Sequence, residues 1–304
     1  MWSGAMILLT GGTGFLGSRI LAELLNNGDK VVVIKRSFSN TKKIEDFLTH
    51  ENVYFFDIDI YDPQELFKKY SIKTIIHAAT EYGRGTTPIV KLLEANLILP
   101  MRLVEIGLNH GVECFINTDS FFTKRTTTYS NLANYSLSKK SLINWLKQLP
   151  KNIKIINVVL EHIYGPDDDT SKFIENTIQK IAVQKVPEIN FTHGHQKRDF
   201  VYIDDVVAAY IKLIQYGSKN NFCFETFEVG TGRSYEVREM IETIQHLSGS
   251  MTKLNFGAIA YRSDEIMESK AEIKKLMALG WNPTITLQNG IEKILKKYKV
   301  IDIK

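Results

Sequence analysis

A glycine-rich motif near the start of the chain constrains the fold more than any other feature of the sequence. It reads TGGTGFLG over residues 10–17 and begins on the last residue of an apolar run, MILLT, at residues 6–10. In a strand–turn–helix unit the first glycine permits a tight turn, the second admits a pyrophosphate to the helix N-terminus, and the third lets helix and strand pack closely. A glycine-rich turn without a ligand is the alternative, but the strand and helix context favours a dinucleotide site. We expect that site to be lined by Gly11, Thr13, Gly14, Phe15, Leu16 and Gly17.

The first half of the chain alternates short β-branched runs with helical stretches. We expect strands at 6–10, 31–35, 53–58, 74–79, 114–118 and 154–160, and helices at 16–26, 63–70, 89–109 and 135–148. Such alternation is typical of successive βαβ units and of a parallel sheet with helices on both faces. We therefore predict an α/β fold, a Rossmann-type doubly wound parallel sheet with a smaller C-terminal substrate-binding lobe.

The chain length predicts one large domain or two closely joined ones, since 304 residues is about twice the usual domain length. The polar tract after residue 166 is too short to be a linker between separate domains. We expect residues 1–166 and 199–227 to form the dinucleotide-binding domain. Residues 167–198 and 228–304 are expected to form the substrate-binding lobe.

Composition excludes several other classes of protein. With 44% hydrophobic and 24% charged residues, the chain is typical of an ordinary globular protein. Its 38 basic and 34 acidic residues are interspersed, so we expect no nucleic-acid partner. No apolar run reaches the roughly 20 residues of a membrane-spanning helix, and no secretory leader is recognisable, so we expect a cytoplasmic protein with no membrane partner. Cys114 and Cys223 are too few for a zinc cluster; we expect both to act as small apolar residues and expect no metal.

The end of the second predicted strand bears on the choice of cofactor. In NAD-binding units an acidic residue at this place hydrogen-bonds the ribose 2′-hydroxyl. Here Lys35 and Arg36 occupy it, and two cations would stabilise a 2′-phosphate. The pair favours NADPH; if both cations only solvate the strand end, NAD(H) is the alternative. Asp59 and Ile60, after the third strand, are placed to meet the adenine edge.

A tyrosine and a lysine four residues apart, Tyr135 and Lys139, lie on one face of the predicted helix 135–148. Lowering a tyrosine pKa from about 10 to near neutrality takes about 4 kcal/mol, which the lysine ammonium and a nicotinamide cation could supply. The pair alone is a weak signal, because any exposed helix can carry it. Thr118, at the end of an upstream strand, adds a hydroxyl suited to a substrate oxygen. Together with the glycine motif, these residues predict a catalytic triad of Thr118, Tyr135 and Lys139.

Further segments follow these motifs along the chain. They are HAAT (77–80), the helix carrying Asn96, HIYGP (162–166), RDFVYIDDV (198–206), FEVGTG (227–232) and LGWNP (279–283). With the triad they make nearly the whole chain resemble the extended short-chain dehydrogenase/reductase family, the NAD(P)-dependent epimerases, dehydratases and reductases of nucleotide sugars. The resemblance implies that Ala78, Ala79, Thr80 and Asn96, besides Tyr135 and Lys139, contact the cofactor.

The resemblance also implies partners for the second lobe and for the whole chain. Arg198 and Arg262 would hold the diphosphate of a nucleotide sugar, since a guanidinium fork suits phosphate. A surface ion pair is the alternative role for each arginine. Family members commonly dimerise through two helices of each subunit, which here implies a homodimer through 89–109 and 135–148.

Departures from the family pattern narrow the activity. Sugar 4,6-dehydratases usually place two acidic residues after the catalytic threonine, whereas Asp119 is followed here by Ser120. His162, preceded by Glu161, replaces the usual asparagine before the YGP turn; it is either a neutral hydrogen-bonding substitute or, less simply, a catalytic acid. Epimerases of the family hold NAD tightly and recycle it, which fits poorly with the two cations after the second strand.

Four segments narrow the resemblance to a subfamily. TEYGR (80–84), EANLILP (94–100), LEHIYGP (160–166) and QKRDFVYIDD (196–205) look most like the CDP-abequose and CDP-paratose synthases, which reduce a CDP-4-keto-3,6-dideoxyhexose at C4. The likeness implies NADPH-dependent reduction of a nucleotide-linked 4-keto sugar in deoxysugar or O-antigen-type polysaccharide biosynthesis. The implied substrate contacts are Tyr82, Asp119, Ser120, His162, Arg198 and Arg262; Arg84 shares the loop of Tyr82, which could equally be a loop without a ligand. An NAD-dependent 4-epimerase and a non-catalytic NADP-binding protein are the alternatives, and the intact triad argues against the second.

Overall fold

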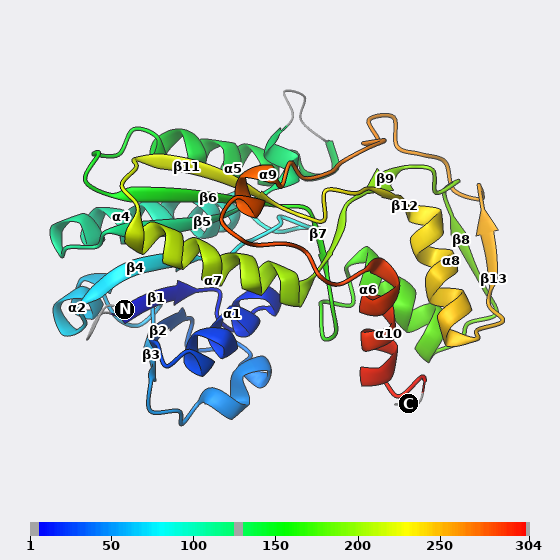
Figure 1. Ribbon diagram of the computed structural model, residues 1–304, viewed down its shortest axis with the longest axis horizontal. Helices are drawn as coiled ribbons and strands as arrows, with labels where there is room; N and C mark the ends of the chain where they lie inside the picture. Colours follow the sequence, from blue (N-terminus) through cyan, green and yellow to red (C-terminus); the bar gives the residue numbers. More distant parts are fainter. Residues whose placement is uncertain (1–5, 125–129, 302–304) are drawn as a thin grey trace. The chain divides into compact units, whose positions relative to one another are not determined.

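The computed structural model describes residues 6–124 and 130–301 (Figure 1). The chain divides into two compact units, the first made of residues 1–159 and 207–227 and the second of residues 160–206 and 228–304. The domain limits expected from the sequence fall near these divisions and stay a prediction.

The first unit is built on a seven-stranded sheet with the strand order β11-β6-β5-β4-β1-β2-β3. Its strands are β1 (Met6–Thr10), β2 (Lys30–Lys35), β3 (Val53–Asp57), β4 (Ile72–His77), β5 (Cys114–Ser120), β6 (Lys154–Leu160) and β11 (Phe224–Val229). Strand β1 pairs in parallel with both β2 and β4, and β2 with β3 and β4 with β5 are also parallel. The predicted doubly wound α/β sheet is confirmed. Strand order reverses between β1 and β4, and such sheets bind ligands at the carboxyl ends of the strands beside this switch.

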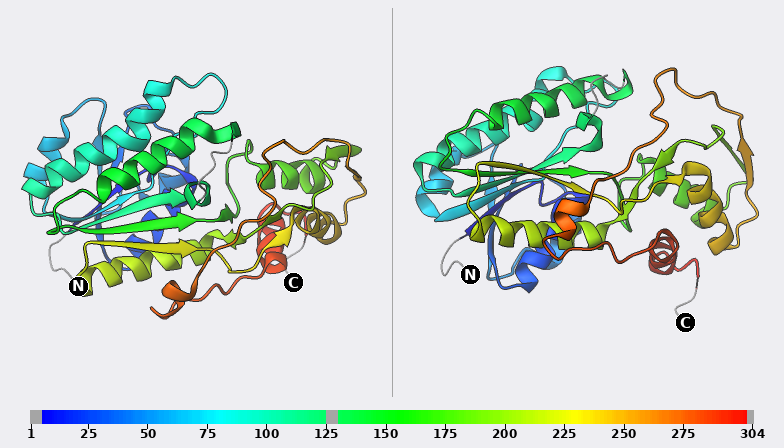
Figure 2. Two further views of the ribbon diagram at one scale, coloured as in Figure 1. Left: turned by 90° about the horizontal axis from the view of Figure 1, so that it is seen from above. Right: turned by 45° about the horizontal axis from the view of Figure 1, so that its top comes forward.

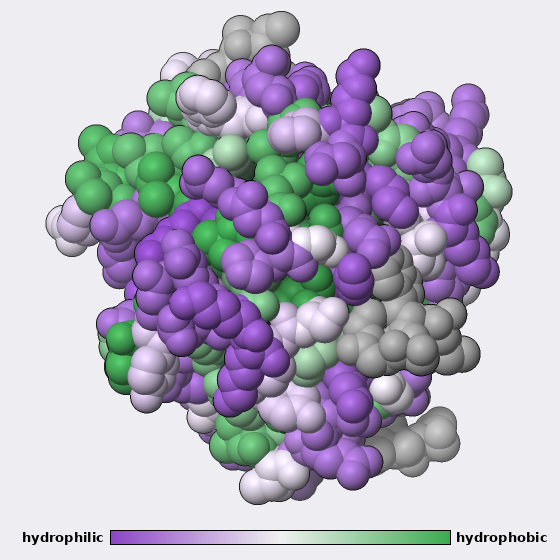
Figure 3. Space-filling model, turned by 90° about the vertical axis from the view of Figure 1, so that its left-hand side faces the viewer, coloured by the Kyte–Doolittle hydropathy of each residue, from purple (hydrophilic) through white to green (hydrophobic). Residues whose placement is uncertain are grey.

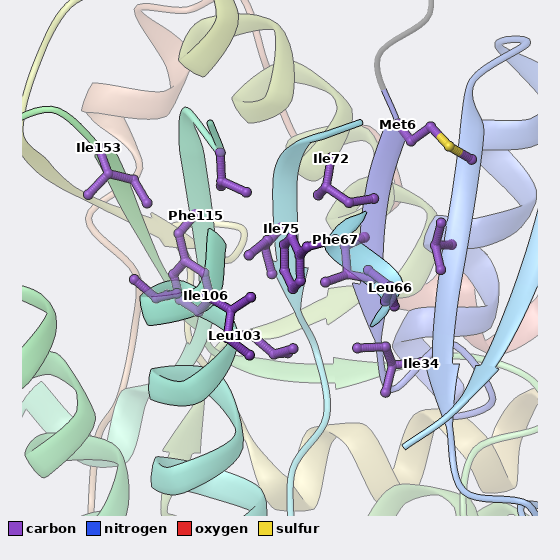
Figure 4. Close-up of a cluster of buried hydrophobic side chains, with 14 of the residues drawn as sticks. Met6, Ile34, Leu66, Phe67, Ile72, Ile75, Leu103, Ile106, Phe115 and Ile153 are labelled. Carbon is purple, nitrogen blue, oxygen red and sulfur yellow. The ribbon is translucent and has the colours of Figure 1, made fainter. Parts of the chain in front are cut away.

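Two layers of helices cover the sheet. On one side lie α2 (Pro63–Lys69), α4 (Leu99–Asn109) and α5 (Ala133–Leu146), and on the other α1 (Phe15–Asn26) and α7 (Ile203–Lys219); Figure 2 shows the sheet between α4 and α5 on one side and α7 on the other. Side chains that alternate along the strands pack against the first layer (Figure 4). The buried cluster includes Leu8, Ile34, Leu66, Phe67, Ile75, Leu103, Phe115, Leu142 and Ile155. On the opposite face, a Cβ at Gly217 of α7 would lie 2.9 Å from Cys114 Sγ, so α7 packs closely on β5.

The predicted helix 89–109 forms with an interruption. Helix α3 (Ile89–Leu93) runs into a π-helical turn at Glu94–Ile98 before α4 begins. Pro100 explains the interruption, because it has no N–H to donate to the carbonyl of Asn96. Such π turns are frequent at functional sites. Short 3-10 turns lie at Lys42–Phe47, Phe121–Lys124 and Ser130–Leu132.

The second unit consists of short strands and helices. These are β7 (His162–Tyr164), α6 (Phe173–Ile178), a π turn (Gln179–Val183), β8 (Glu188–Phe191), β9 (Lys197–Arg198), β10 (Phe200–Tyr202), β12 (Tyr235–Glu236), α8 (Val237–Ser248), β13 (Lys253–Phe256), α9 (Lys274–Met277) and α10 (Leu287–Lys297). Strand β10 pairs with β7, β12 with β9 and β13 with β8. Distant motifs meet here: the Asp205 carboxylate accepts the N–H groups of Thr284 and Ile285, and Trp281 Nε1 donates to the Asp205 carbonyl.

Among the described residues no helix is both long and apolar enough to cross a membrane. No metal-binding group of histidine, cysteine or acidic residues occurs in the same part of the chain. Cys114 is buried, as expected, and its burial raises the pKa of its thiol to about 12. Cys223 is exposed, so the expectation that it packs as a small apolar residue is wrong. It lies in the loop just before β11, between Phe222 and Phe224, which are both half-buried.

Candidate active site

The glycine motif forms a narrow cradle between β1 and α1. Gly11 has a φ of +71°, and a Cβ there would lie 2.6 Å from the backbone nitrogen of Ala79 after β4. A Cβ at Gly17 would lie 2.1 Å from the Gly11 carbonyl oxygen, so only glycine fits either position. The side chains of Phe15 and Leu16 are buried, and their N–H groups open the first turn of α1. These residues fit a dinucleotide pyrophosphate, which needs backbone donors and no intervening side chain.

The two cations at the end of β2, Lys35 and Arg36, differ in their contacts. Lys35 forms an ion pair with Asp57 on the neighbouring strand. The guanidinium of Arg36 lies 4.9 Å from the centre of the Phe38 ring. Asp59 accepts hydrogen bonds of 2.7 Å from both the backbone and the hydroxyl of Ser37, and these bonds lower the pKa of the Asp59 carboxyl. Arg36 is thus the cation of this pair that no carboxylate of the described chain neutralises.

Asn96, on the π turn, ties the loop after β4 to α5. Its amide donates to the Glu81 carbonyl at 2.8 Å and to Ser138 Oγ at 3.0 Å. Its carbonyl accepts the N–H of Glu81 at 2.8 Å and the hydroxyl of Thr80 at 3.3 Å. The side chain is fully buried and uses both donor hydrogens and both acceptor positions. Asn96 therefore positions Thr80 beside α5, and its direct contact with a cofactor stays a prediction.

Tyr135 and Lys139 are both buried on α5. Burial raises the pKa of Tyr135 well above its usual value, and nearby Tyr82 and Asp119 raise it further; hydrogen bonds with Ser120 and Thr80 act in the opposite direction. The expected lowering by Lys139 is not found, because burial dominates. Burial also lowers the pKa of Lys139 to about 8, against the attraction of Asp119. The protein alone thus holds Tyr135 as a protonated phenol, a state that can donate a proton.

Thr118 is held from both sides of the sheet. Its carbonyl accepts a hydrogen bond of 2.9 Å from Lys139 Nζ on α5. Its hydroxyl lies 2.6 Å from the hydroxyl of Tyr210 on α7. Strand β5 continues to Ser120, so Thr118 is inside the strand and not at its predicted end. Sequence reasoning missed Tyr210, which lies 92 residues from Thr118 in an ordinary helical pattern.

Asp119 and Ser120 face different surroundings. Asp119 is 2% exposed, and its Oδ2 accepts hydrogen bonds from Asn157 Nδ2 at 3.1 Å and Thr123 Oγ1 at 2.8 Å. Burial raises the pKa of the Asp119 carboxyl. Asn157 also accepts a 2.7 Å hydrogen bond from Asn117, so Asp119 belongs to a buried polar network. Ser120, in contrast, reaches the Tyr135 hydroxyl.

An aromatic stack covers Tyr135. The Tyr82 ring lies 5.0 Å from the Tyr135 ring at an interplanar angle of 27°, and the Arg84 guanidinium lies 5.0 Å from the centre of the Tyr82 ring. Phe122 meets Tyr135 edge-on at 6.2 Å. The loop carrying Tyr82 therefore packs against the Tyr135 ring. Its predicted contact with substrate stays a prediction.

The remaining predicted substrate residues lie in the second unit. Arg198 forms an ion pair of 2.6 Å with Glu265 and also donates to the carbonyls of Ile266 and Lys197. Arg262 is exposed and shares a turn with Glu265, whose N–H bonds the Arg262 carbonyl. Diphosphate binding by either arginine stays a prediction, and at Arg198 a phosphate would compete with Glu265.

His162 lies beside a buried carboxylate in the same unit. Burial lowers the pKa of His162, although Glu161, 3.9 Å from its Nδ1, acts in the opposite direction. Glu161 also accepts a 2.7 Å hydrogen bond from Ser269. A neutral imidazole agrees with the hydrogen-bonding interpretation of His162 more than with that of a catalytic acid.

Comparison with known proteins adds three findings. The model for the NAD dependent epimerase/dehydratase family matches residues 7–230. Two curated proteins named CDP-abequose synthase, from Salmonella muenchen and Salmonella typhimurium, are 36% and 32% identical to this chain over 95% and 96% of it and 96% and 97% of their own lengths. A crystal structure of UDP-glucuronic acid 4-epimerase from Bacillus cereus in complex with UDP-glucuronic acid and NAD matches with a TM-score of 0.82 at 24% identity, over 96% of this chain and 99% of that one. This structural likeness shows a shared fold.

Proposed function

Because the chain belongs to the NAD dependent epimerase/dehydratase family, whose members are extended short-chain dehydrogenases/reductases, we propose that it uses NADPH to reduce the C4 ketone of a nucleotide-linked 4-keto-6-deoxy or 4-keto-3,6-dideoxy sugar. The observation that carries the proposal is the buried, protonated phenol of Tyr135 beside Ser120 and Thr80, on the helix that also buries Lys139. The two relatives named CDP-abequose synthase support a CDP-linked substrate and a place in deoxysugar synthesis. We further propose that this synthesis serves O-antigen-type polysaccharide and takes place in the cytoplasm.

The chain's own residues supply the proton and the charge stabilisation that ketone reduction needs. The nicotinamide, when bound, supplies the hydride to C4 of the sugar. Tyr135 donates its proton to the ketone oxygen as negative charge develops there. Thr118 directs a hydroxyl to the same oxygen, so the charge is stabilised where it forms. Lys139 stabilises the phenolate that Tyr135 becomes, before a proton from solvent restores the phenol.

The preference for NADPH rests on Arg36. Lys35 is paired with Asp57, so Arg36 is the cation available for a 2′-phosphate. We expect Arg36→Ala to raise KM for NADPH by about 10- to 100-fold, because charge-assisted hydrogen bonds to the 2′-phosphate would be lost. KM for NADH, which has no 2′-phosphate, should change by less than about twofold. Lys35→Ala is the matched control and should have the smaller effect. Steady-state kinetics with both cofactors measures this, and equal losses with NADPH and NADH would refute the assignment.

The activity itself is tested with a panel of nucleotide-linked ketones. CDP-, dTDP-, UDP- and GDP-linked 4-keto-6-deoxy and 4-keto-3,6-dideoxy sugars are mixed with the protein, and NADPH and NADH oxidation is followed by absorbance. We expect rapid NADPH oxidation with a CDP-linked ketone. NAD-dependent 4-epimerisation is the second candidate function, because one solved structure with this fold is that of a 4-epimerase in complex with NAD. Tightly held NAD with no oxidation on any ketone would favour that candidate.

We also propose that the protein forms a homodimer through α3, the π turn and α5. Five large apolar side chains here are more than half exposed: Ile89, Val90, Ile98, Leu137 and Trp145. Figure 3 shows apolar patches at the upper left, in the centre and at the lower left of a face that is otherwise largely polar. Continuous apolar surface on a globular protein commonly marks an interface, and a self-complementary patch gives a twofold dimer.

A charge introduced into this patch should dissociate the dimer. We expect Leu137→Lys to shift the protein from dimer to monomer in sedimentation velocity, since a buried interfacial charge without a partner costs several kcal/mol. Met251→Lys is the control, because Met251 is 94% exposed and belongs to the second unit. A monomeric wild type, or a Leu137→Lys variant that stays dimeric, would contradict this interface.

A further inference from the structure

We propose that Tyr210 is a positioning residue of the reaction: its buried hydroxyl donates a hydrogen bond to Thr118 Oγ1 and thereby directs the hydrogen of Thr118 towards the substrate oxygen. The inference rests on the proposed function, in which Thr118 hydrogen-bonds that oxygen. Tyr210 itself touches neither substrate nor cofactor in this account. It acts through Thr118, and the hydrogen bond between them is 2.6 Å long.

The packing of α7 on β5 brings Tyr210 and Thr118 together. Thr118 shares a face of β5 with Cys114, since side chains four residues apart in a strand point the same way. Cys114 faces α7, where a Cβ at Gly217 would lie 2.9 Å from its Sγ. Tyr210 precedes Gly217 by two helical turns and so lies on the same face of α7. The glycine brings the helix close, and Tyr210 meets Thr118 with its side chain fully buried.

The direction of the hydrogen bond follows from counting donors and acceptors. Each hydroxyl has one hydrogen, so one residue donates and the other keeps its hydrogen for a different partner. Within residues 6–124 and 130–301 the Tyr210 hydroxyl hydrogen-bonds only to Thr118. If Thr118 donated, the phenolic hydrogen would be left buried and unpaired, which is costly. Burial and the nearby Asp119 also raise the pKa of Tyr210, so the phenol keeps its proton.

The hydrogen bond from Tyr210 leaves the Thr118 hydroxyl to act as a donor. With Oγ1 accepting from Tyr210, its hydrogen is free to point to the accessible side, since Thr118 is half-buried whereas Tyr210 is fully buried. Lys139 holds the Thr118 carbonyl at 2.9 Å from the opposite face of the sheet. The donor is thus oriented before substrate arrives, and preorganised donors stabilise developing charge most effectively.

A double-mutant cycle tests the inference. We expect Tyr210→Phe to lower kcat about 10-fold while KM for the ketone changes less than about twofold, and Thr118→Val to lower kcat about 100-fold. The double variant should match Thr118→Val, because Tyr210 has no route to the substrate without the threonine hydroxyl. Tyr216→Phe, which removes a hydroxyl from the same helix, should leave kcat unchanged. The thermal midpoints of all four variants are measured alongside.

The outcomes separate the possible failures. The inference is overturned if Tyr210→Phe leaves kcat unchanged, if its effect persists in full in the Thr118→Val background, or if only the thermal midpoint and KM change. If the wild type interconverts C4 epimers without consuming NADPH, the proposed reduction fails instead. The same cycle measured on epimerisation then still decides the role of Tyr210, because the hydroxyl of Thr118 would serve the same oxygen.

Discussion

Tyr135→Phe is expected to lower kcat for ketone reduction by about three orders of magnitude while changing the affinity for NADPH by less than about twofold. The substitution removes the proton donor but keeps the ring that stacks on Tyr82 at 5.0 Å and meets Phe122 edge-on. The cofactor cradle at Gly11 and Gly17 is untouched. Steady-state kinetics gives kcat, and quenching of intrinsic fluorescence on titration gives the affinity for NADPH.

Tyr54→Phe provides the control for this substitution. It removes a phenolic hydroxyl from β3, away from the carboxyl ends of the central strands, and should preserve kcat. A Tyr135→Phe variant that retained wild-type turnover would mean that another group protonates the ketone oxygen. The assignment of Tyr135 as the acid would then have to be abandoned.

Lys139→Met is expected to lower kcat by about 100-fold and, at the same time, to make the protein more stable by about 2 kcal/mol at pH 7. Activity falls because no cation remains to support the phenolate of Tyr135. Stability rises because the native protein buries an ammonium that is 1% exposed, and burial lowers the pKa of Lys139 from 10.5 to about 8. That difference, which already includes the attraction to Asp119, is worth about 3 kcal/mol, and the lost hydrogen bond to the Thr118 carbonyl returns about one.

The gain in stability should depend on pH in a defined direction. Below pH 8 both the folded and unfolded chains hold the Lys139 proton, and the full cost of burying the charge is present. Between pH 8 and 10.5 the unfolded chain binds more protons, so the wild type becomes relatively more stable as pH rises. The advantage of Lys139→Met should therefore shrink across this window. Denaturant unfolding at several pH values measures it, and a destabilised variant at pH 7 would contradict the account.

The local motifs were readable from the sequence because each has a short-range physical requirement. Gly11 and Gly17 are sites where a Cβ would strike backbone, so their spacing in the chain already defines the turn. The pair Tyr135 and Lys139 shares a helix face by periodicity alone. The doubly wound parallel sheet and six of its seven strands followed from alternating apolar runs and helices, whereas the seventh strand, β11, was not predicted.

The contacts that modify those motifs come from distant parts of the chain and carry no sequence pattern. Asp57 on β3 forms an ion pair with Lys35 on the neighbouring strand β2, and Glu265 pairs with Arg198, which lies 67 residues away in the chain. The tie between Tyr210 and Thr118 depends on how α7 packs on β5. Burial, which raises the pKa of Tyr135, is a property of the packed molecule. Pro100 is a local signal of the π turn, because it removes an N–H from the predicted helix.

The most direct test of the central claim follows deuterium from NADPH labelled at C4 of the nicotinamide into the product sugar. The protein is incubated with the labelled cofactor and a CDP-linked 4-keto-3,6-dideoxyhexose, and the product is analysed by NMR and mass spectrometry. We expect one NADPH to be consumed for each deuterium found at C4 of the sugar, and the Tyr135→Phe variant to incorporate deuterium about a thousandfold more slowly. Interconversion of C4 epimers with NADPH unconsumed and no deuterium in the sugar would contradict it.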